Sequence, residues 1–237
     1  IGGETMSNQG DTDMSNLLRN VVPSYNVNDQ PISDAATLVR PANLRGLAPD
    51  HTLMLVNGKR RHRASVITWL GNGISNGSQG PDAAAIPALA LKRIEVLRDG
   101  ASAQYGSDAI AGVMNFVLND AREGGSVEVR YGEYKEGDGE QVTIAGNIGL
   151  PLGDSGFLNL TAEWGESDPT SRSEQRADAQ SLIDDGYQGV PAPAMIWGRP
   201  IVNDDMKLWA NFGVDLSDTL ELYGHANYNS KEVDGGF

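Results

Sequence analysis

The sequence predicts a small α+β domain followed by a run of antiparallel β-strands. Glycine supplies 29 of the 237 residues, and this favours turns, bends and strands over long helices. A sustained alternation of apolar and polar residues begins only after Gly125. Residues 1–122 hold 11 basic and 11 acidic side chains, whereas residues 123–237 hold 7 and 21. We therefore expect two domains, residues 1–122 and 123–237, in different surroundings.

The first domain combines a helix, a hairpin and further strands. Asp11-Thr12-Asp13 offers capping oxygens ahead of apolar residues at helical spacing, and Pro23 ends that pattern, so a short amphipathic helix is expected. The apolar run 52–56, the turn dipeptide Asn57-Gly58 and the basic run 59–63 predict a hairpin with a basic second arm. The remaining expectations are an exposed loop over 69–80, strands over 91–97 and 113–118, and a helical turn over 101–105.

The second domain is expected to contain five strands that share one apolar and one polar face. They cover residues 127–132, 142–150, 158–165, 207–216 and 220–228. Two connections are short and that over 166–205 is long, with Ser173-Glu174-Gln175-Arg176 predicting a short capped helix inside it. This rhythm is typical of outer-membrane barrels, although a soluble antiparallel sandwich alternates in the same way. The strand pattern alone supports both equally, and the long connection favours the barrel modestly.

Other classes of protein find little support. The chain has no cysteine, and His51, His62 and His225 lack the spacing of a metal site. No apolar run approaches the roughly 20 residues of a membrane-spanning helix. The acidic second half argues against nucleic acid as a partner. Since no Ser-His-Asp, Cys-His or dinucleotide pattern can be assembled, we expect neither an enzyme nor a cofactor.

Four segments of the first domain carry a family resemblance. They are Asn43-Leu44-Arg45-Gly46-Leu47-Ala48-Pro49-Asp50, Thr52-Leu53-Met54-Leu55-Val56-Asn57-Gly58-Lys59-Arg60, Arg93-Ile94-Glu95-Val96-Leu97-Arg98-Asp99-Gly100, and Ala103-Gln104-Tyr105-Gly106-Ser107-Asp108-Ala109-Ile110-Ala111-Gly112-Val113-Met114-Asn115. Their order and spacing closely resemble the plug domain of TonB-dependent outer-membrane receptors. The resemblance implies an α+β plug domain followed by antiparallel strands of an incomplete transmembrane β-barrel. The resemblance also implies a TonB-contacting segment before Ile1 and a complete barrel of about 22 strands, so we expect the chain to be a fragment truncated at both ends.

The same resemblance implies a function. Such a receptor imports a scarce nutrient complex, a ferric siderophore or similar, across the bacterial outer membrane by energised movement of the plug. Its expected partners are TonB, through a segment before Ile1, an extracellular nutrient ligand, and outer-membrane lipid. The sequence leaves the ligand open among ferric siderophores, cobalamin, saccharides and peptides. The alternative is a soluble β-rich binding or adhesion protein that only shares the plug motifs.

The resemblance also suggests site residues. Arg45 and Arg98 match family arginines that pair with carboxylates of the barrel wall, and an arginine enclosed by another domain needs such a partner. The basic arm 59–63 has the charge to attract anionic ligands or nucleic acid, but we favour a hairpin arm that is charge-paired with the barrel lining. The loop after the hairpin either contacts ligand or is a mobile loop without ligand contact, and the two are equally supported. Its candidate contact residues are Trp69, Asn72, Asn76 and Gln79.

Overall fold

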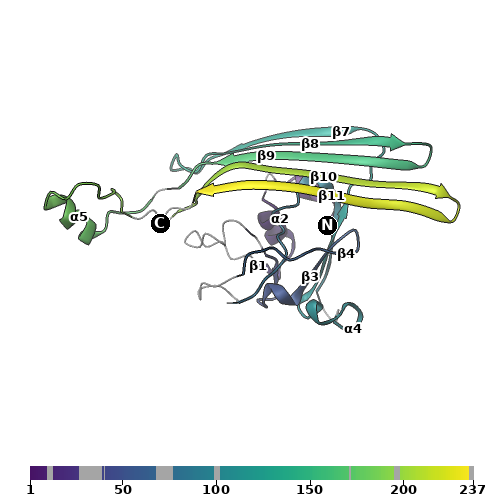
Figure 1. The fold of residues 1–237 in the computed structure, drawn as a ribbon, viewed down its shortest axis with the longest axis horizontal. Helices are drawn as coiled ribbons and strands as arrows, with labels where there is room; N and C mark the ends of the chain where they lie inside the picture. Colours follow the sequence, from purple (N-terminus) through teal and green to yellow (C-terminus); the bar gives the residue numbers. More distant parts are fainter. Residues whose placement is uncertain are drawn as a thin grey trace.

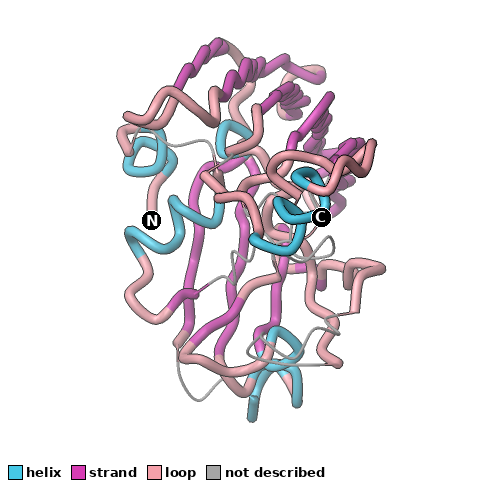
Figure 2. The backbone as a smooth tube through the Cα atoms, turned by 90° about the vertical axis from the view of Figure 1, so that its left-hand side faces the viewer, coloured by secondary structure: helices cyan, strands magenta, loops and turns pink. Residues whose placement is uncertain are grey.

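The computed structural model contains two main sheets, which lie one above the other. The described residues are 1–9, 13–26, 39, 41–67, 77–98, 102–170, 172–194 and 198–234. A four-stranded sheet with several helices lies against a sheet of five strands, four of which are much longer (Figure 1). Seen along the long strands, the strands of the small sheet run across their direction (Figure 2). The expected change of architecture along the sequence is therefore present.

The small sheet has the order β4-β3-β6-β5. Its members are β3 (Thr52–Val56), β4 (Lys59–Arg60), β5 (Leu91–Leu97) and β6 (Gly112–Leu118). β3 runs parallel to β6, and the other neighbours are antiparallel. The predicted hairpin and both later strands are confirmed, although β4 includes only the first two residues of the basic arm. A separate two-stranded sheet joins β1 (Tyr25–Asn26) to β2 (Asn43–Leu44).

Short helices cover this sheet. The predicted amphipathic helix is α2 (Met14–Val21), and the carboxylate of its N-cap Asp13 accepts a hydrogen bond from Ser15 N at 2.8 Å. The predicted helical turn is α4 (Ser102–Tyr105). α1 (Gly3–Ser7) was not predicted, because its sequence, GETMS, has few strong helix formers. The 3-10 helices are η1 (Pro49–His51), η2 (Ala88–Ala90) and η3 (Ser107–Ala109).

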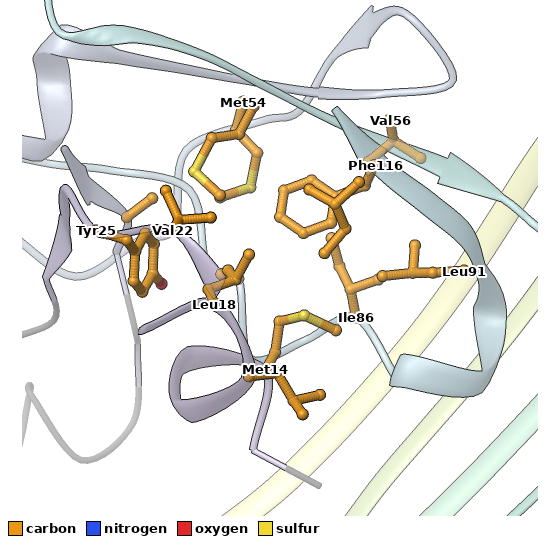
Figure 3. Close-up of a cluster of buried hydrophobic side chains, with 14 of the residues drawn as sticks. Met14, Leu18, Val22, Tyr25, Met54, Val56, Ile86, Leu91 and Phe116 are labelled. Atoms are coloured by element: carbon orange, nitrogen blue, oxygen red, sulfur yellow. The ribbon is translucent and has the colours of Figure 1, made fainter. Parts of the chain in front are cut away.

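The main hydrophobic core lies between α2 and one face of the small sheet. Leu18 of α2 and its C-cap residue Val22 share this core with Met54, Val56 and Phe116 from the strands (Figure 3). One member of this cluster, Trp209, comes from the long strands. A second, smaller cluster lies on the other face of the sheet. Its members are Leu53, Leu55, Ala109 and Val113.

The long strands form one antiparallel sheet, which we call the wall, with the order β11-β10-β9-β8-β7. Its members are β7 (Gly125–Gly132), β8 (Gln141–Leu152), β9 (Gly156–Ser167), β10 (Ile201–Ser217) and β11 (Leu220–Asp234). The five predicted strands are confirmed. β10 begins earlier than predicted, so the long connection covers residues 168–200. Within the described residues, no helix is long and apolar enough to cross a membrane.

The long connection contains helix α5 (Ala177–Asp184), which Figure 1 shows beyond the ends of the strands. The predicted helix is present, but its predicted cap is wrong. Arg176 is the N-cap residue and makes no side-chain capping hydrogen bond. The sequence predicts Ser173 as the N-cap residue. The helix begins four residues after it, at Ala177, so Arg176 occupies that position instead.

The two faces of the wall differ as the alternation predicts. The apolar face points away from the small domain, and Val127 there is 79% exposed and Val129 67%. The polar face is covered by the small domain, and its buried members include Asn159, Thr161 and Asn211. Polar side chains that would ordinarily meet water are therefore enclosed and must find partners in the other domain.

Candidate functional site

The two domains meet along an interface that we call the seam. From the small domain it includes Asn57, Arg61, Ala85, Asn119 and Ala121; from the wall it includes Asn147, Asn159, Trp209, Asn211 and Asn227. The wall members occupy two neighbouring rows that run across the strands. Successive cross-strand partners in the first row are Asn147, Thr161, Trp209 and Asn227. The second row contains the pair Asn159 and Asn211. The strand register therefore aligns them on the same face.

Asn57 connects both domains at one point. It occupies the first position of the β3–β4 turn with φ 48°, a left-handed conformation that asparagine tolerates better than most residues. Its Oδ1 accepts a hydrogen bond from Leu118 N at 2.8 Å, and its Nδ2 donates to Asn211 Oδ1 at 3.0 Å. The same side chain thus fixes the end of β6 and links β3 to β10.

A chain of amide hydrogen bonds continues from there. Asn211 Nδ2 donates to Asn119 O at 2.9 Å, and Asn119 Nδ2 donates to Asn147 Oδ1 at 3.3 Å. Asn147 Nδ2 lies 2.6 Å from Asn159 Oδ1 and 2.8 Å from Thr161 Oγ1. Each buried hydrogen bond contributes about 0.5–1.5 kcal/mol, and leaving one partner buried alone costs about 1–3 kcal/mol. The network is therefore costly to separate.

Trp209 places a wall side chain inside the small domain's core. Its side chain is 4% exposed, and its Nε1 donates to Ala85 O at 2.9 Å. The guanidinium of Arg61 lies 5.2 Å from the Trp209 ring centroid, and its Nη1 donates to Asn227 Oδ1 at 2.7 Å. Burial lowers the pKa of Arg61, while the nearby Asp82 carboxylate raises it. Arg61 also lowers the pKa of His62 by repelling a second positive charge.

The connector 119–124 passes directly from β6 to β7 and is bonded to the wall along its length. Asn159 Nδ2 donates to Ala121 O at 3.5 Å, and Arg122 Nη2 donates to Asp154 O at 2.7 Å. Gly149 of β8 donates its N–H to Gly124 O at 2.9 Å. A Cβ at Gly149 would lie 2.4 Å from Ala121 O, so glycine is what allows this close approach.

The wall also carries a buried ionic cluster beside the seam. Lys207 Nζ lies 2.6 Å from Glu163 Oε1, and the side chains of Lys207 and Glu163 are 12% and 5% exposed. Asp205 lies within 3.6 Å of Lys207 and 3.4 Å of Lys231. The lysines and carboxylates of this cluster are therefore paired with one another within the wall.

The structure brings Arg45 and Arg98 together at the surface of the small domain. Arg45 Nη1 donates to Arg98 O at 3.4 Å, both side chains are exposed, and Arg45 has φ 59°. Their pairing with carboxylates of the barrel wall remains a prediction.

The basic arm finds one carboxylate partner within the plug. Arg60 forms an ion pair with Asp108, and Arg63 lies 3.9 Å from the same carboxylate. Arg61 contacts a wall amide, and Lys59 Nζ lies 5.7 Å from the Tyr223 ring centroid. Within the described residues the partner of Arg60 and Arg63 is therefore a carboxylate of the plug itself, and pairing of the arm with the barrel lining remains a prediction. Asp108, which follows the arm by 45 residues or more, is brought to it by the fold of η3.

Of the candidate ligand contacts, Trp69, Asn72 and Asn76 lie outside the described residues. Gln79 is half-buried; its N–H donates to Asp50 Oδ1 at 2.9 Å and its Nε2 to Ala64 O at 2.6 Å. The expected exposure of this loop is wrong at its end, where Ser78 and Gly80 are buried. A Cβ on Gly80 would lie 2.6 Å from the Pro49 side chain, so the chain packs closely there.

Sequence reasoning missed most of the seam. The sequence predicts only a turn at Asn57, and the alternation predicts a polar position at Trp209. A large aromatic among polar positions was an available sign that this face is covered. Across the described part of the chain, no group of three His, Asp or Glu side chains could hold a metal ion.

Comparisons with known proteins agree with this architecture. Residues 1–113 match the model of the TonB-dependent Receptor Plug Domain. The ferrienterobactin receptor of Escherichia coli K12 is 30% identical over 223 residues, which cover 89% of this chain and 28% of that receptor. The probable TonB-dependent siderophore receptor PirA of Acinetobacter baumannii is 30% identical over 145 residues, or 59% of this chain and 19% of that protein.

Solved structures show the same fold. A structure of the ferric enterobactin receptor PfeA of Pseudomonas aeruginosa covers 98% of this chain with a TM-score of 0.70 at 19% identity, and the match spans 33% of that chain. The siderophore receptor PirA of the same organism covers 98% of this chain with a TM-score of 0.60 at 20% identity, and the match spans 34% of that chain.

A small α+β domain seated on the polar face of an antiparallel sheet is the arrangement of a plug domain against the strands of a barrel. This chain belongs to the TonB-dependent receptor family, and its N-terminal domain is the plug. The family consists of receptors and transporters, and this supports the receptor over the soluble binding protein. The chain spans less than a third of the curated relatives' length.

Proposed function

We propose that this chain provides the plug and the first wall strands of an outer-membrane receptor that imports a ferric siderophore. The observation that carries the proposal is the similarity to the ferrienterobactin receptor, which extends through both domains over 89% of the chain. The two faces of the wall support it physically. The exposed apolar face suits contact with lipid, and the polar face suits contact with an enclosed plug.

The proposal includes location and partners. The receptor lies in the bacterial outer membrane, with its plug inside the barrel lumen. TonB engages a segment that precedes Ile1, and movement of the plug admits the ligand. We further propose that Trp69, Asn72, Asn76 and Gln79 contact the ligand from the loop after the hairpin, with Gln79 also holding Ala64 O.

The ligand class we favour is a ferric catecholate. Receptors named for ferric enterobactin recur among both the similar sequences and the similar structures. Aromatic and amide side chains in the proposed contact loop could stack on catechol rings and hydrogen-bond to their oxygens.

Uptake of radiolabelled ligands, labelled with iron in the siderophores and with cobalt in cobalamin, tests this proposal. The full-length receptor is expressed in a host that lacks its own siderophore receptors, and ferric enterobactin, a ferric hydroxamate and cobalamin are offered in turn. We expect saturable uptake of iron from enterobactin that disappears in a TonB-deficient host. Uptake of the hydroxamate or cobalamin alone would overturn the ligand class, and uptake that persists without TonB would overturn the mechanism.

A further inference from the structure

We propose that the seam stays closed while the ligand passes, so that the passage does not run between the plug and strands β8–β11. This inference rests on the proposed function, in which the plug moves to admit the ligand. The inference concerns only the seam. Whichever part of the plug rearranges, the end of β6 and the Asn57 turn keep their positions against the wall.

The first support is covalent. β6 ends at Leu118 and β7 begins at Gly125, so only a short connector separates the plug sheet from the wall. Ala121 O, Arg122 and Gly124 O are all hydrogen-bonded to the wall. The end of β6 therefore cannot move away from β8 and β9 unless this connector is stripped from them.

The second support is the pair of strands that the seam holds. Asn57 joins the end of β3 to Leu118 N of β6 and to Asn211 of β10. Trp209, two residues away on β10, lies in the same core cluster as Met54, Val56 and Phe116. Opening the seam would withdraw the indole from that core and separate Arg61 from Asn227 at the same time. The central strands of the plug are thus fixed to β10 by polar and apolar contacts together.

The third support is that the plug contains a part separate from the seam. The cluster of Leu53, Leu55, Ala109 and Val113 lies on the other face of the sheet and shares no residue with the main core. The exposed pairs of Arg60 and Arg63 with Asp108 join the hairpin arm to η3 on that side. A rearrangement of η3 and α4 can therefore take place while the seam remains intact.

Crosslinking across the seam tests the inference. The chain has no cysteine, so Asn57→Cys with Asn211→Cys introduces one defined pair into the plug and wall segment. The full-length double variant, freed of any cysteine elsewhere, is treated with a short cleavable thiol crosslinker, and uptake of ferric enterobactin is measured. We expect uptake within twofold of the untreated variant. The single variants Asn57→Cys and Asn211→Cys, given the same reagent, are the matched controls.

A tenfold or larger loss of uptake in the crosslinked double variant only, restored when the crosslink is cleaved, would overturn the inference. Hydrogen exchange on the unmodified receptor decides it independently of any variant. The indole N–H of Trp209, which donates across the seam to Ala85 O, should keep its protection when ligand and energised TonB are supplied. A tenfold faster exchange of this indole N–H under those conditions would show that the seam opens. An unmodified receptor that imports no ligand would count against the proposed function, and exchange at the Trp209 indole would still report on the seam.

Discussion

At the scale of single residues, Asn57 combines a backbone role with two side-chain roles. Its left-handed φ suits asparagine or glycine, and its amide carries one hydrogen bond within the plug and one to the wall. Glycine could keep the backbone but not the bonds, and aspartate could accept from Leu118 N but not donate to Asn211. Asparagine satisfies all three requirements at this position.

Replacing Asn57 separates these contributions. Asn57→Gly should lower the free energy of unfolding of the plug by about 1–3 kcal/mol, because two hydrogen bonds of about 0.5–1.5 kcal/mol each are lost. Asn57→Ala should cost about 1–2 kcal/mol more, since alanine is strained in the left-handed region. Hydrogen exchange of β3 and β6 amides measures both. Equal effects of glycine and alanine would contradict the role assigned to the backbone.

Arg61 and His62 give a prediction about pH. The pKa of His62 is lowered mainly by the Arg61 charge, so the folded plug binds a proton at His62 less readily than the unfolded chain. The free energy of unfolding therefore falls as the pH is lowered from about 6.5, the ordinary histidine pKa, towards the lowered pKa of His62 in the folded plug. Arg61→Gln should raise the His62 pKa and weaken this dependence, whereas Arg61→Lys should preserve it. Titration of the His62 ring resonances by NMR distinguishes the two variants.

Arg45 and Arg98 remain the proposed contacts between the plug and carboxylates of the complete barrel. Replacing both by alanine in the full receptor should speed hydrogen exchange in residues 40–118 and increase passive conductance, because breaking one buried ion pair costs about 3–5 kcal/mol. Lys92→Ala, which removes an exposed charge paired with Asp120, is the matched control. Exchange and conductance that match the control would count against the pairing.

The residues predicted from sequence and those found at the seam differ for a physical reason. Local spacing identified Asn57-Gly58 as a turn, and alternation placed Asn159 and Asn211 on the polar face. Which plug atom each of these amides meets depends on how two sheets are placed against each other, and no local pattern contains that information. Trp209 illustrates the point, because its strand position predicted a polar environment and the plug supplies an apolar one.

At the scale of elements, the connector and β8 form a close backbone contact that depends on glycine. Gly149 faces Ala121 O, whereas Gly146 on the same strand has only ordinary contact, at 3.8 Å, for an added Cβ. The sequence predicted β8 correctly from its alternation, but glycine in a strand could equally have marked a bulge. Boundaries were less predictable: α5 begins beyond its expected cap, and β10 extends towards the long connection.

This contrast supplies a matched pair of variants. Gly149→Ala should destabilise the contact between connector and wall by about 1–3 kcal/mol, since the added methyl group meets backbone that cannot easily move. Gly146→Ala should be neutral or stabilising by about 0.4–1 kcal/mol through the unfolded state. Thermal unfolding of the receptor, with exchange at Gly124 and Gly149, measures both. A Gly146→Ala variant as unstable as Gly149→Ala would show that the strand rejects alanine generally.

At the scale of the whole molecule, neither part is complete alone. The wall has two edge strands, β7 and β11, whose outer backbone groups find no partner in this sheet. The plug in turn takes a core side chain from β10. The division of the sequence near residue 122, which charge and periodicity suggested, therefore separates two chemical environments but cuts through one hydrophobic cluster.

Two lengths of chain test this dependence. A chain of residues 1–122 should be soluble and partly folded, but about 3–5 kcal/mol less stable than the plug in the full receptor, because it lacks Trp209. Residues 1–237 should aggregate in water through the open edges and the apolar face of the wall. Size exclusion and circular dichroism of both, with Trp209→Ala in the full receptor for comparison, measure these outcomes. A monodisperse 237-residue chain would contradict the open-edge argument.

The position of Trp209 also sets an order in time. The plug is synthesised first, yet the side chain that completes its core lies about 90 residues beyond the end of β6. At a rate of synthesis of about 5–20 residues per second, several seconds pass between the completion of β6 and the synthesis of Trp209. During that interval the plug core lacks one of its side chains. The plug can therefore reach its final packing only after β7, β8 and β9 have been synthesised.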